Sequence, residues 1–207
     1  MPRHVDADRR KSDIVDAAWQ LIAEEGLEAL TIRRLAAELG GATGRITNYF
    51  ASKDDILIAV LDELTNSHAS GLTSLQSELE IAGADTDRVA RAIVGALPID
   101  EPRRQDWKVW LAFWGRAAMS PRVADQHRET YRQWRQVLGA ALTTLTGTTP
   151  PAEDLDRAAE HLLACIDGLG VHLLIEPDRS NNTELIELLR AHVSQACAGL
   201  AATSSAS

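Results

Sequence analysis

Apolar residues recur along this chain at the three- and four-residue spacing of helices, and the alternating pattern of strands is almost absent. In residues 10–25, one face is apolar and consists of Ile14, Val15, Ala18, Leu21 and Ile22. Glycine, proline and asparagine residues divide the chain into about nine such segments. The pattern predicts an all-α fold.

The predicted helices begin and end where these patterns do. They cover approximately residues 10–25, 31–39, 43–50, 52–80, 86–97, 107–118, 123–145, 155–173 and 184–200. Thr31 and Ser52 stand where N-caps are expected, and Asn181 with Glu184 has the spacing of a capping pair. Residues 98–102, with a proline at each end, are predicted to interrupt the helical part.

The second and third predicted helices are short and meet at a tight glycine turn, as in a helix-turn-helix. Their apolar stripes are predicted to be buried: Ile32, Leu35, Ala36, Leu39, Ile46 and Phe50. The outer face of the third helix then carries no acid and consists of Thr43, Arg45, Thr47, Asn48 and Tyr49. From spacing alone, this face fits either an anionic partner such as DNA or a packed connector with a polar outer side.

The stretch TIRRLAAELGGATGRITNYFASKDDILI also resembles a known family. It has the family's residue types at fixed spacing at Thr31, Ile32, Leu35, Ala36, Gly40, Gly44, Ile46, Tyr49, Phe50, Lys53 and Leu57. Through these positions, the chain from Ala17 to Leu57 resembles the DNA-binding domain of the TetR family of regulators. The resemblance implies a helix-turn-helix that binds a double-stranded DNA operator.

The resemblance also implies which residues face DNA. They are Arg33, Arg34, Thr43, Gly44, Arg45, Thr47, Asn48, Tyr49 and Lys53. Among them, Arg45 can donate two hydrogen bonds to a guanine edge, and Asn48 can pair with adenine. Tyr49 and Lys53 suit phosphates.

The chain departs from the family pattern at the turn. Gly41 and Ala42 stand where an apolar residue and a serine are common, so Thr43 is expected to cap the third helix one residue later. Thr47 replaces a frequent tyrosine. These departures leave the register of the base contacts less defined than the fold.

Charge gives no positive evidence for DNA. The 207 residues hold 21 Lys and Arg against 30 Asp and Glu, a net charge of -9. Residues 1–56 hold 8 basic and 10 acidic residues, so the acid excess lies mainly in the rest of the chain. Arg9, Arg10 and Lys11 are expected either to form a basic arm near the minor groove or simply to solvate the terminus.

The segment ALPIDEPRRQDWKVWLAFWGRA, followed by Pro121, resembles the C-terminal domain of the BetI-type branch of the TetR family, which holds an effector cavity. The effector-binding candidates are Trp107, Trp110, Trp114, Tyr131 and Trp134. The three clustered tryptophans share one helical face, whereas Val109 and Phe113 point elsewhere. This face either packs a core or lines a pocket, where indole rings suit an aromatic or cationic small molecule.

The last two predicted helices are broadly apolar, and Gly168 and Gly170 permit close helix approach. Two such helices from each subunit predict a four-helix bundle across a two-fold axis, and therefore a homodimer. The alternative is that they pack within the monomer. A dimer would place two recognition helices about 34–36 Å apart, the spacing of successive major grooves.

Other classes of function find little support. The sequence has no phosphate loop, no HExxH and no nucleophile elbow, so no catalytic site, metal or cofactor is expected. Cys165 and Cys197 are expected as buried thiols in a reducing cytosol. Without a signal segment or a long uninterrupted apolar run, the chain is predicted to be cytoplasmic and to span no membrane.

The sequence therefore predicts a DNA-binding domain over residues 1–56, an effector-binding and dimerisation domain over 57–202, and a disordered tail over 203–207. The expected function is a ligand-responsive transcriptional repressor that a small-molecule effector releases from a palindromic operator. The alternatives are a helical protein-interaction module without DNA binding and a small helical enzyme.

Overall fold

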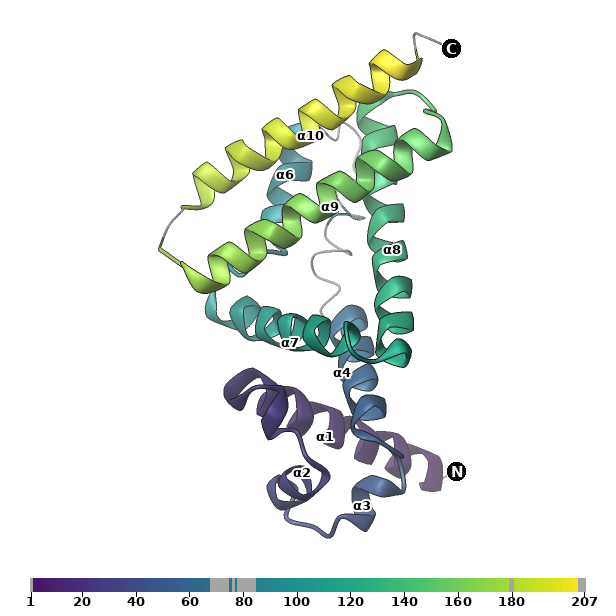
Figure 1. The fold of residues 1–207 in the computed structure, drawn as a ribbon, viewed down its shortest axis with the longest axis vertical. Coiled ribbons are helices and arrows are strands. Elements are labelled where there is room, and N and C mark those ends of the chain that lie inside the picture. The colour runs from purple at the N-terminus through teal and green to yellow at the C-terminus, as the bar shows by residue number, and fades with distance from the viewer. Residues whose placement is uncertain (1, 68–74, 76, 78–84, 179–180, 205–207) are drawn as a thin grey trace. The chain divides into compact units, whose positions relative to one another are not determined.

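The computed structural model describes residues 2–67, 75, 77, 85–178 and 181–204. Every regular element in these ranges is a helix (Figure 1), which confirms the all-α prediction. The predicted course of the fourth helix beyond residue 67 lies outside the described residues, except that Leu75 and Ser77 are helical. The chain separates into two compact units, which are described one at a time.

The first unit comprises Met1–His68 and Gln105–Arg128. Its elements are α1 (Pro2–Glu25), the 3₁₀ turn η1 (Leu27–Ala29), α2 (Ile32–Glu38), α3 (Gly44–Thr47), α4 (Lys53–Ser67), most of α7 (Glu101–Ala117) and the start of α8 (Pro121–Thr146). The predicted apolar stripe of α1 is buried in its core, and Phe113 of α7 is buried in the same cluster. Residues far beyond the helix-turn-helix therefore complete the core of this unit.

The second unit comprises Ala69–Arg104 and Glu129–Ser207. Its described helices are α6 (Thr86–Val94), the remainder of α8, α9 (Ala152–Ile175) and α10 (Asn182–Ser204). Both α6 and α9 pack against α10. The predicted capping pair of α10 is confirmed, because Glu184 N–H donates to Asn181 Oδ1 at 3.0 Å and Asn181 N–H donates to Glu184 Oε2 at 3.2 Å.

Several predicted helix boundaries are wrong. Helix α1 begins at Pro2 and not near Arg10, so Arg9, Arg10 and Lys11 lie within it. Helix α7 begins at Glu101, because Pro102 lies in the first turn, where a missing N–H costs no helical bond. Helix α10 continues to Ser204, into the segment predicted as a tail, and residues 205–207 lie outside the described part.

The two units do not follow the predicted division at residue 56. Helix α4 and residues 105–128 belong to the same compact unit as the helix-turn-helix. The assignment of DNA binding to residues 1–56, and of effector binding and dimerisation to residues 57–202, remains a prediction.

Candidate functional site

The helix-turn-helix buries four of its six predicted core residues, whereas Ile32 and Leu39 are half-buried at the edge of the core. Leu35 and Ala36 of α2 are buried, as are Ile46 of α3 and Phe50 just after it. The predicted N-cap of α2 is confirmed, since the Thr31 hydroxyl accepts the Arg34 N–H at 3.1 Å. The buried residues fix one side of α3 against the core and leave its other side to solvent.

The turn between α2 and α3 depends on Gly40, which has a φ of 60°. Gly40 N–H donates to the Ala37 carbonyl at 3.1 Å, and Gly41 N–H donates to the Ala36 carbonyl at 3.0 Å. These two bonds form a Schellman motif, in which the residue after the helix takes the left-handed conformation. Glycine adopts that conformation without the strain that a Cβ would add.

The expected cap of α3 is wrong. Thr43 already has helical backbone angles, with φ −55° and ψ −32°, and its side chain makes no capping hydrogen bond. The first bond of the turn runs from Arg45 N–H to the Ala42 carbonyl, so the preceding position, Ala42, has no side-chain oxygen to offer. The helix is also shorter than predicted and covers only Gly44–Thr47.

The outward face of α3 has the predicted composition. Its exposed residues are Thr43, Gly44, Arg45, Thr47 and Asn48, and Tyr49 is half-buried against the core. The aliphatic part of Arg45 lies over the turn, because its Cδ is 3.4 Å from where a Cβ on Gly41 would stand. No ion pair of Arg45 occurs within the described residues, so its guanidinium is available to a partner.

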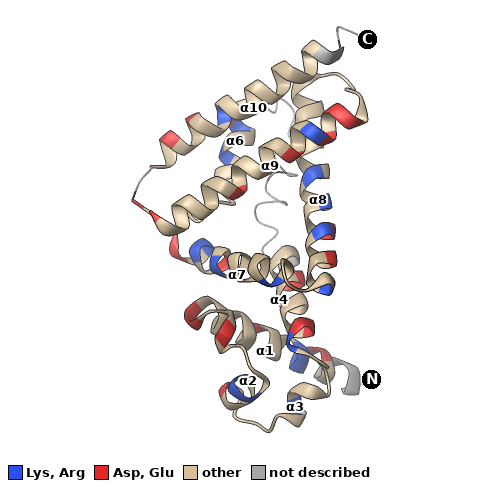
Figure 2. Cartoon of the chain, in the orientation of Figure 1, with Lys and Arg blue, Asp and Glu red and all other residues tan. Residues whose placement is uncertain are grey.

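The two arginines of α2 differ. Arg33 is exposed, whereas Arg34 pairs with Glu25 at 2.7 Å and Glu38 at 2.6 Å. The hydrogen bond that Arg34 donates to Glu25 is the main cause that raises the pKa of Arg34. A cavity of about 440 Å³ beside this pair is strongly acidic, with Asp13, Asp16, Glu24, Glu25 and Glu38 in its wall. Figure 2 shows acidic positions in red on α1, and an acidic wall such as this one would repel phosphates.

Two lysines flank α3. The Lys53 ammonium donates to the Leu27 carbonyl at 2.6 Å, so it ties the first turn of α4 to η1 and keeps two N–H donors for other partners. Lys11, on α1, lies with its Nζ 5.8 Å from the centre of the Phe50 ring. This cation–π contact holds a second ammonium beside the end of the recognition helix.

Acidic side chains in the first turn of α4 are paired across the first unit. Asp54 accepts two hydrogen bonds from Arg116, at 2.8 and 3.0 Å, and one from the Ser120 hydroxyl at 2.8 Å. The bonds from Arg116 are the main cause that lowers the pKa of Asp54. Asp55 pairs with Arg122 and also bonds the Ser52 hydroxyl, whose oxygen accepts the Asp55 N–H as the predicted cap of α4.

The three clustered tryptophans pack mainly as core. Trp107 is buried, and Trp110 and Trp114 are half-buried against the core of the first unit. Trp107 and Trp114 meet edge to face, with ring centres 5.9 Å apart. The Trp114 Nε1 atom is buried and has no hydrogen-bond partner among the described residues. Phe113, predicted to point elsewhere, is the fully buried aromatic of α7.

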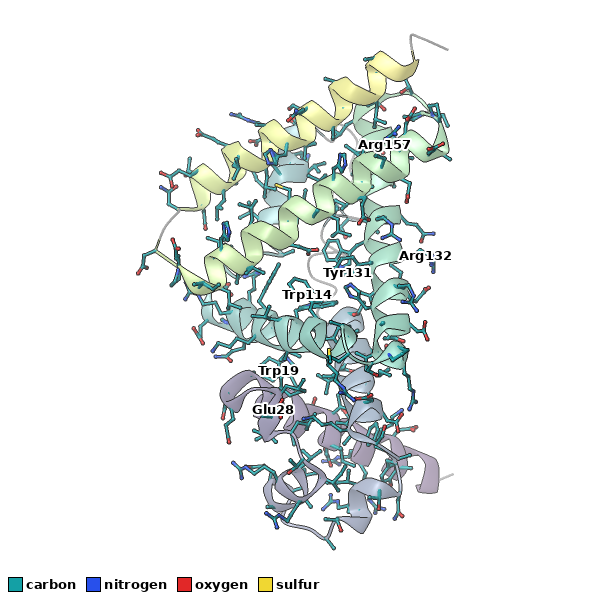
Figure 3. The ribbon with its side chains drawn as sticks, in the orientation of Figure 1. Trp19, Glu28, Trp114, Tyr131, Arg132 and Arg157 are labelled. Carbon is teal, nitrogen blue, oxygen red and sulfur yellow. The ribbon has the colours of Figure 1, made fainter. Side chains whose placement is uncertain are left out.

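The other two effector-binding candidates, Tyr131 and Trp134, are half-buried on the part of α8 that belongs to the second unit. Tyr131 points from α8 toward α9 (Figure 3), where its hydroxyl donates to Asp167 Oδ2 at 2.6 Å. Burial raises the pKa of Asp167 to about 6, against the opposing effect of the tyrosine bond. The five candidates are divided between the two units, and their common site remains a prediction.

Helices α9 and α10 border a groove of about 450 Å³. Its wall includes Arg157, His161 and Cys165 from α9, and His192 and Gly199 from α10. Cys165 and Cys197 are free thiols and only half-buried, so the expectation of two buried thiols is wrong. Burial nevertheless raises the pKa of both.

By length and composition alone, α9 could cross a membrane, although only 33% of its most apolar window is buried. One such helix is weak evidence for a membrane span, because core helices of soluble proteins pass the same test. The expected absence of a long uninterrupted apolar run still holds for α9, because Asp167 and His172 interrupt its apolar part.

Comparison with known families decides the identity of the chain. Residues 14–60 match the family described as bacterial regulatory proteins, tetR family, and residues 72–198 match the BetI-type transcriptional repressor, C-terminal. The second match alone covers more than half of the sequence. The chain belongs to the TetR family. Both resemblances drawn from the sequence are thereby confirmed.

Individual relatives of this TetR-family chain extend over most of its length. The HTH-type transcriptional regulator PksA of Bacillus subtilis (strain 168) is 25% identical over 201 residues, covering 95% of this chain and 94% of PksA. BetI of Rhizobium meliloti (strain 1021) is 29% identical and covers 77% of this chain and 75% of BetI.

Solved structures have the same fold. A transcriptional regulator from Rhodococcus sp. Rha1 is 29% identical with a TM-score of 0.76, covering 91% of this chain and 96% of the other. A regulator from Saccharomonospora viridis, solved in complex with choline, is 27% identical with a TM-score of 0.71 and covers 91% and 95%.

As a TetR-family member, the chain is a helix-turn-helix transcriptional regulator and not an enzyme. Regulators of this family bind operator DNA, dimerise and respond to small molecules. The individual DNA-facing and effector-binding residues remain predictions.

Sequence reasoning missed two features of this TetR-family chain. The pairing of Asp54 with Arg116 joins residues 62 positions apart, and no local pattern announces it. Asp167 could have been found, because it is a lone acid inside the apolar run LLACIDGLGVHLL. A carboxylate at such a position is costly unless it is bonded or used.

Proposed function

We propose that this TetR-family regulator is a repressor that binds a palindromic operator as a homodimer and leaves it when a small molecule binds. The observation that carries the proposal is the exposed, acid-free face of α3 in a chain of net charge -9. Arg45 and Asn48 on this face have the donors and acceptors that read guanine and adenine in the major groove.

The acidic cavity beside α2 supports one orientation on DNA. Phosphates would be repelled from the side of α1 that holds Glu24 and Glu25, and attracted to the side with Lys11 and Arg45. In this orientation, Arg33, Thr43, Gly44, Thr47 and Asn48 face the groove, with Tyr49 and Lys53 near the backbone. Arg34 can face the groove only if its ion pairs with Glu25 and Glu38 break.

Dimerisation is proposed through α9 and α10. Helix α9 is the most apolar helix of membrane-spanning length in the described part of the chain, yet most of its apolar window is not buried within the protomer. Ile175 at its end and Leu188 on α10 are exposed apolar residues. A Cβ on Gly168 or Gly199 would meet nothing within 4 Å, so a partner's helix could approach closely there. A second copy would bury this surface.

The effector is proposed to be a small organic cation. Supporting observations are the relative solved with choline and the indole cluster of α7. Within the second unit, the mostly buried carboxylate of Asp167, bonded by Tyr131, offers a separate negative charge that suits a cation. We also propose that the protein acts in the cytoplasm, with α9 covered by its partner subunit and not by lipid.

An electrophoretic mobility shift with the DNA upstream of the protein's own gene tests this function. The expected result is one shifted band that contains two protein chains per duplex. An excess of unlabelled operator should abolish this band, and the same excess of random DNA should not. A protein that shifts no DNA, while remaining folded, would instead be an interaction module and would contradict the proposal.

A further inference from the structure

The first turn of α4 is held by residues that lie far away in the sequence. We define the α4 joint as Asp54, Asp55, Arg116, Ser120 and Arg122. All five belong to the first compact unit, so the joint is internal to the body that carries the helix-turn-helix. The side chains of Asp54 and Asp55 are only 17% and 14% exposed, which shows that the joint is closed over them.

The joint places two arginines against two carboxylates at a functional position. Arg116 binds both oxygens of Asp54, the geometry in which an arginine–carboxylate pair is strongest. Glu28, on η1, adds a further negative charge near Arg116. Without the two arginines, Asp54 and Asp55 would lose the ion pairs that compensate their charges.

The position matters because of what precedes it in the chain. Lys53, the residue expected to contact a phosphate, is directly followed by Asp54 and Asp55. A phosphate at Lys53 would therefore lie within about one Debye length, roughly 10 Å at 0.1 M salt, of both carboxylates. Uncompensated, their charge would oppose the attraction that Lys53 provides.

The helix dipole explains why acids stand here, but not why arginines cover them. Asp54 and Asp55 are favourable in the first turn of any helix, whether or not they are paired. The pairing from α7 and from the start of α8 adds a cross-helix contact that the dipole does not require. It makes the net charge beside the DNA-binding face depend on where residues 116–122 lie.

We propose that Arg116 and Arg122 are positioning residues for operator binding, because they neutralise Asp54 and Asp55 in the DNA-competent state. Opening of the joint uncovers two carboxylates per subunit beside the DNA backbone and lowers operator affinity. This inference rests on the proposed function. A ligand that prefers the open joint would release DNA by the difference between its affinities for the two states.

The experiment uses the full-length protein and duplex operators that the wild type selects from a random pool. Operator affinity is measured from 0.05 to 0.3 M salt for R116Q, D54N and the double variant R116Q/D54N. R91Q is the matched control, because Arg91 also pairs with an aspartate, Asp87, but lies in the second unit. Circular dichroism and sedimentation check that each variant is folded and dimeric.

We expect R116Q to bind about tenfold more weakly than the wild type at 0.1 M salt, with a deficit of less than about threefold at 0.3 M as salt screens the exposed carboxylate. R116Q/D54N should regain most of the lost affinity, although the joint is still broken. D54N alone should bind at least as tightly as the wild type, and R91Q should be unchanged.

A merely structural joint gives a different pattern. If R116Q/D54N stays as weak as R116Q at every salt concentration, or if R116Q binds like R91Q, the inference is overturned. Should R116Q fail to fold, R122Q provides the same test at the second pair, since the Arg122 side chain is 64% exposed and its loss disturbs little packing. A wild type that selects no DNA would overturn the proposed function itself.

Discussion

At the scale of single residues, the exposed face of α3 offers few ways to read a base. Arg45 is the only residue of that face with a positive charge, and its stem is supported by the glycine turn. Asn48 presents both a donor and an acceptor. The two residues lie three positions apart, almost one helical turn, so we expect them to contact neighbouring base pairs.

The substitution Arg45→Ala should relax preference at one base pair and weaken the best operator by about 1–3 kcal/mol. The reason is that a bidentate contact to guanine is lost while the phosphate contacts remain. Binding titrations against all single-base variants of the operator measure this. An equal loss on every variant would mean that Arg45 contacts only the backbone.

Asp167 should make stability depend on pH. Its pKa is raised to about 6 in the folded protein by burial, so the folded state favours the protonated carboxyl. Its stabilising contribution is complete below about pH 4, the value of an unfolded aspartate, and is lost as pH rises through 6. Asp167→Asn should therefore stabilise the protein at pH 7.5 by about 1–3 kcal/mol, and by much less at pH 4.5.

Urea unfolding at the two pH values checks this prediction. The amide keeps an oxygen that accepts the Tyr131 hydroxyl, so the hydrogen bond itself is retained. The same change in unfolding free energy at both pH values would show that ionisation of Asp167 is not its cause.

At the scale of elements, local signals account for much of the fold. The spacing of apolar residues identified the helices, and the caps at Thr31, Ser52 and Asn181 were recognisable from their residue types. The start of α7 was not, because Pro102 looks like a breaker until it is known to lie in a first turn. The α4 joint could not be predicted at all, since its partners meet only in the folded chain.

Gly40→Ala should destabilise the protein by about 1–2 kcal/mol, because it places a Cβ in the left-handed conformation. Gly44→Ala is the matched control, since Gly44 is helical and a Cβ there meets nothing within 4 Å. It should leave stability unchanged or raise it by up to about 1 kcal/mol. Urea unfolding compares the two, and equal destabilisation would contradict the role given to the Gly40 turn.

At the scale of the whole molecule, a single protomer has apolar surface on α9 that is not buried within it. Within the described residues, only 33% of the most apolar window of α9 is buried, and α9 borders a groove of about 450 Å³ with α10. A symmetric partner would cover this surface and would also duplicate the recognition helix. The same dimer would therefore both bury this apolar surface and match the two-fold symmetry of a palindromic operator.

Ala196→Arg should dissociate the dimer, because Ala196 lines the groove between α9 and α10. Ala198→Arg, two residues along the same helix and exposed outside that wall, should leave the dimer intact. Sedimentation velocity distinguishes the two. A dimer that tolerates both substitutions would place the interface elsewhere.

The most direct test of the central claim is a hydroxyl-radical footprint of the protein on its operator. Because a two-fold dimer presents the acid-free face of α3 twice, the footprint should show two protected half-sites. Their centres should lie about one helical turn apart, 10–10.5 base pairs, or a multiple of it, and be related by a dyad. A single protected half-site, or uniform protection without a dyad, would contradict it.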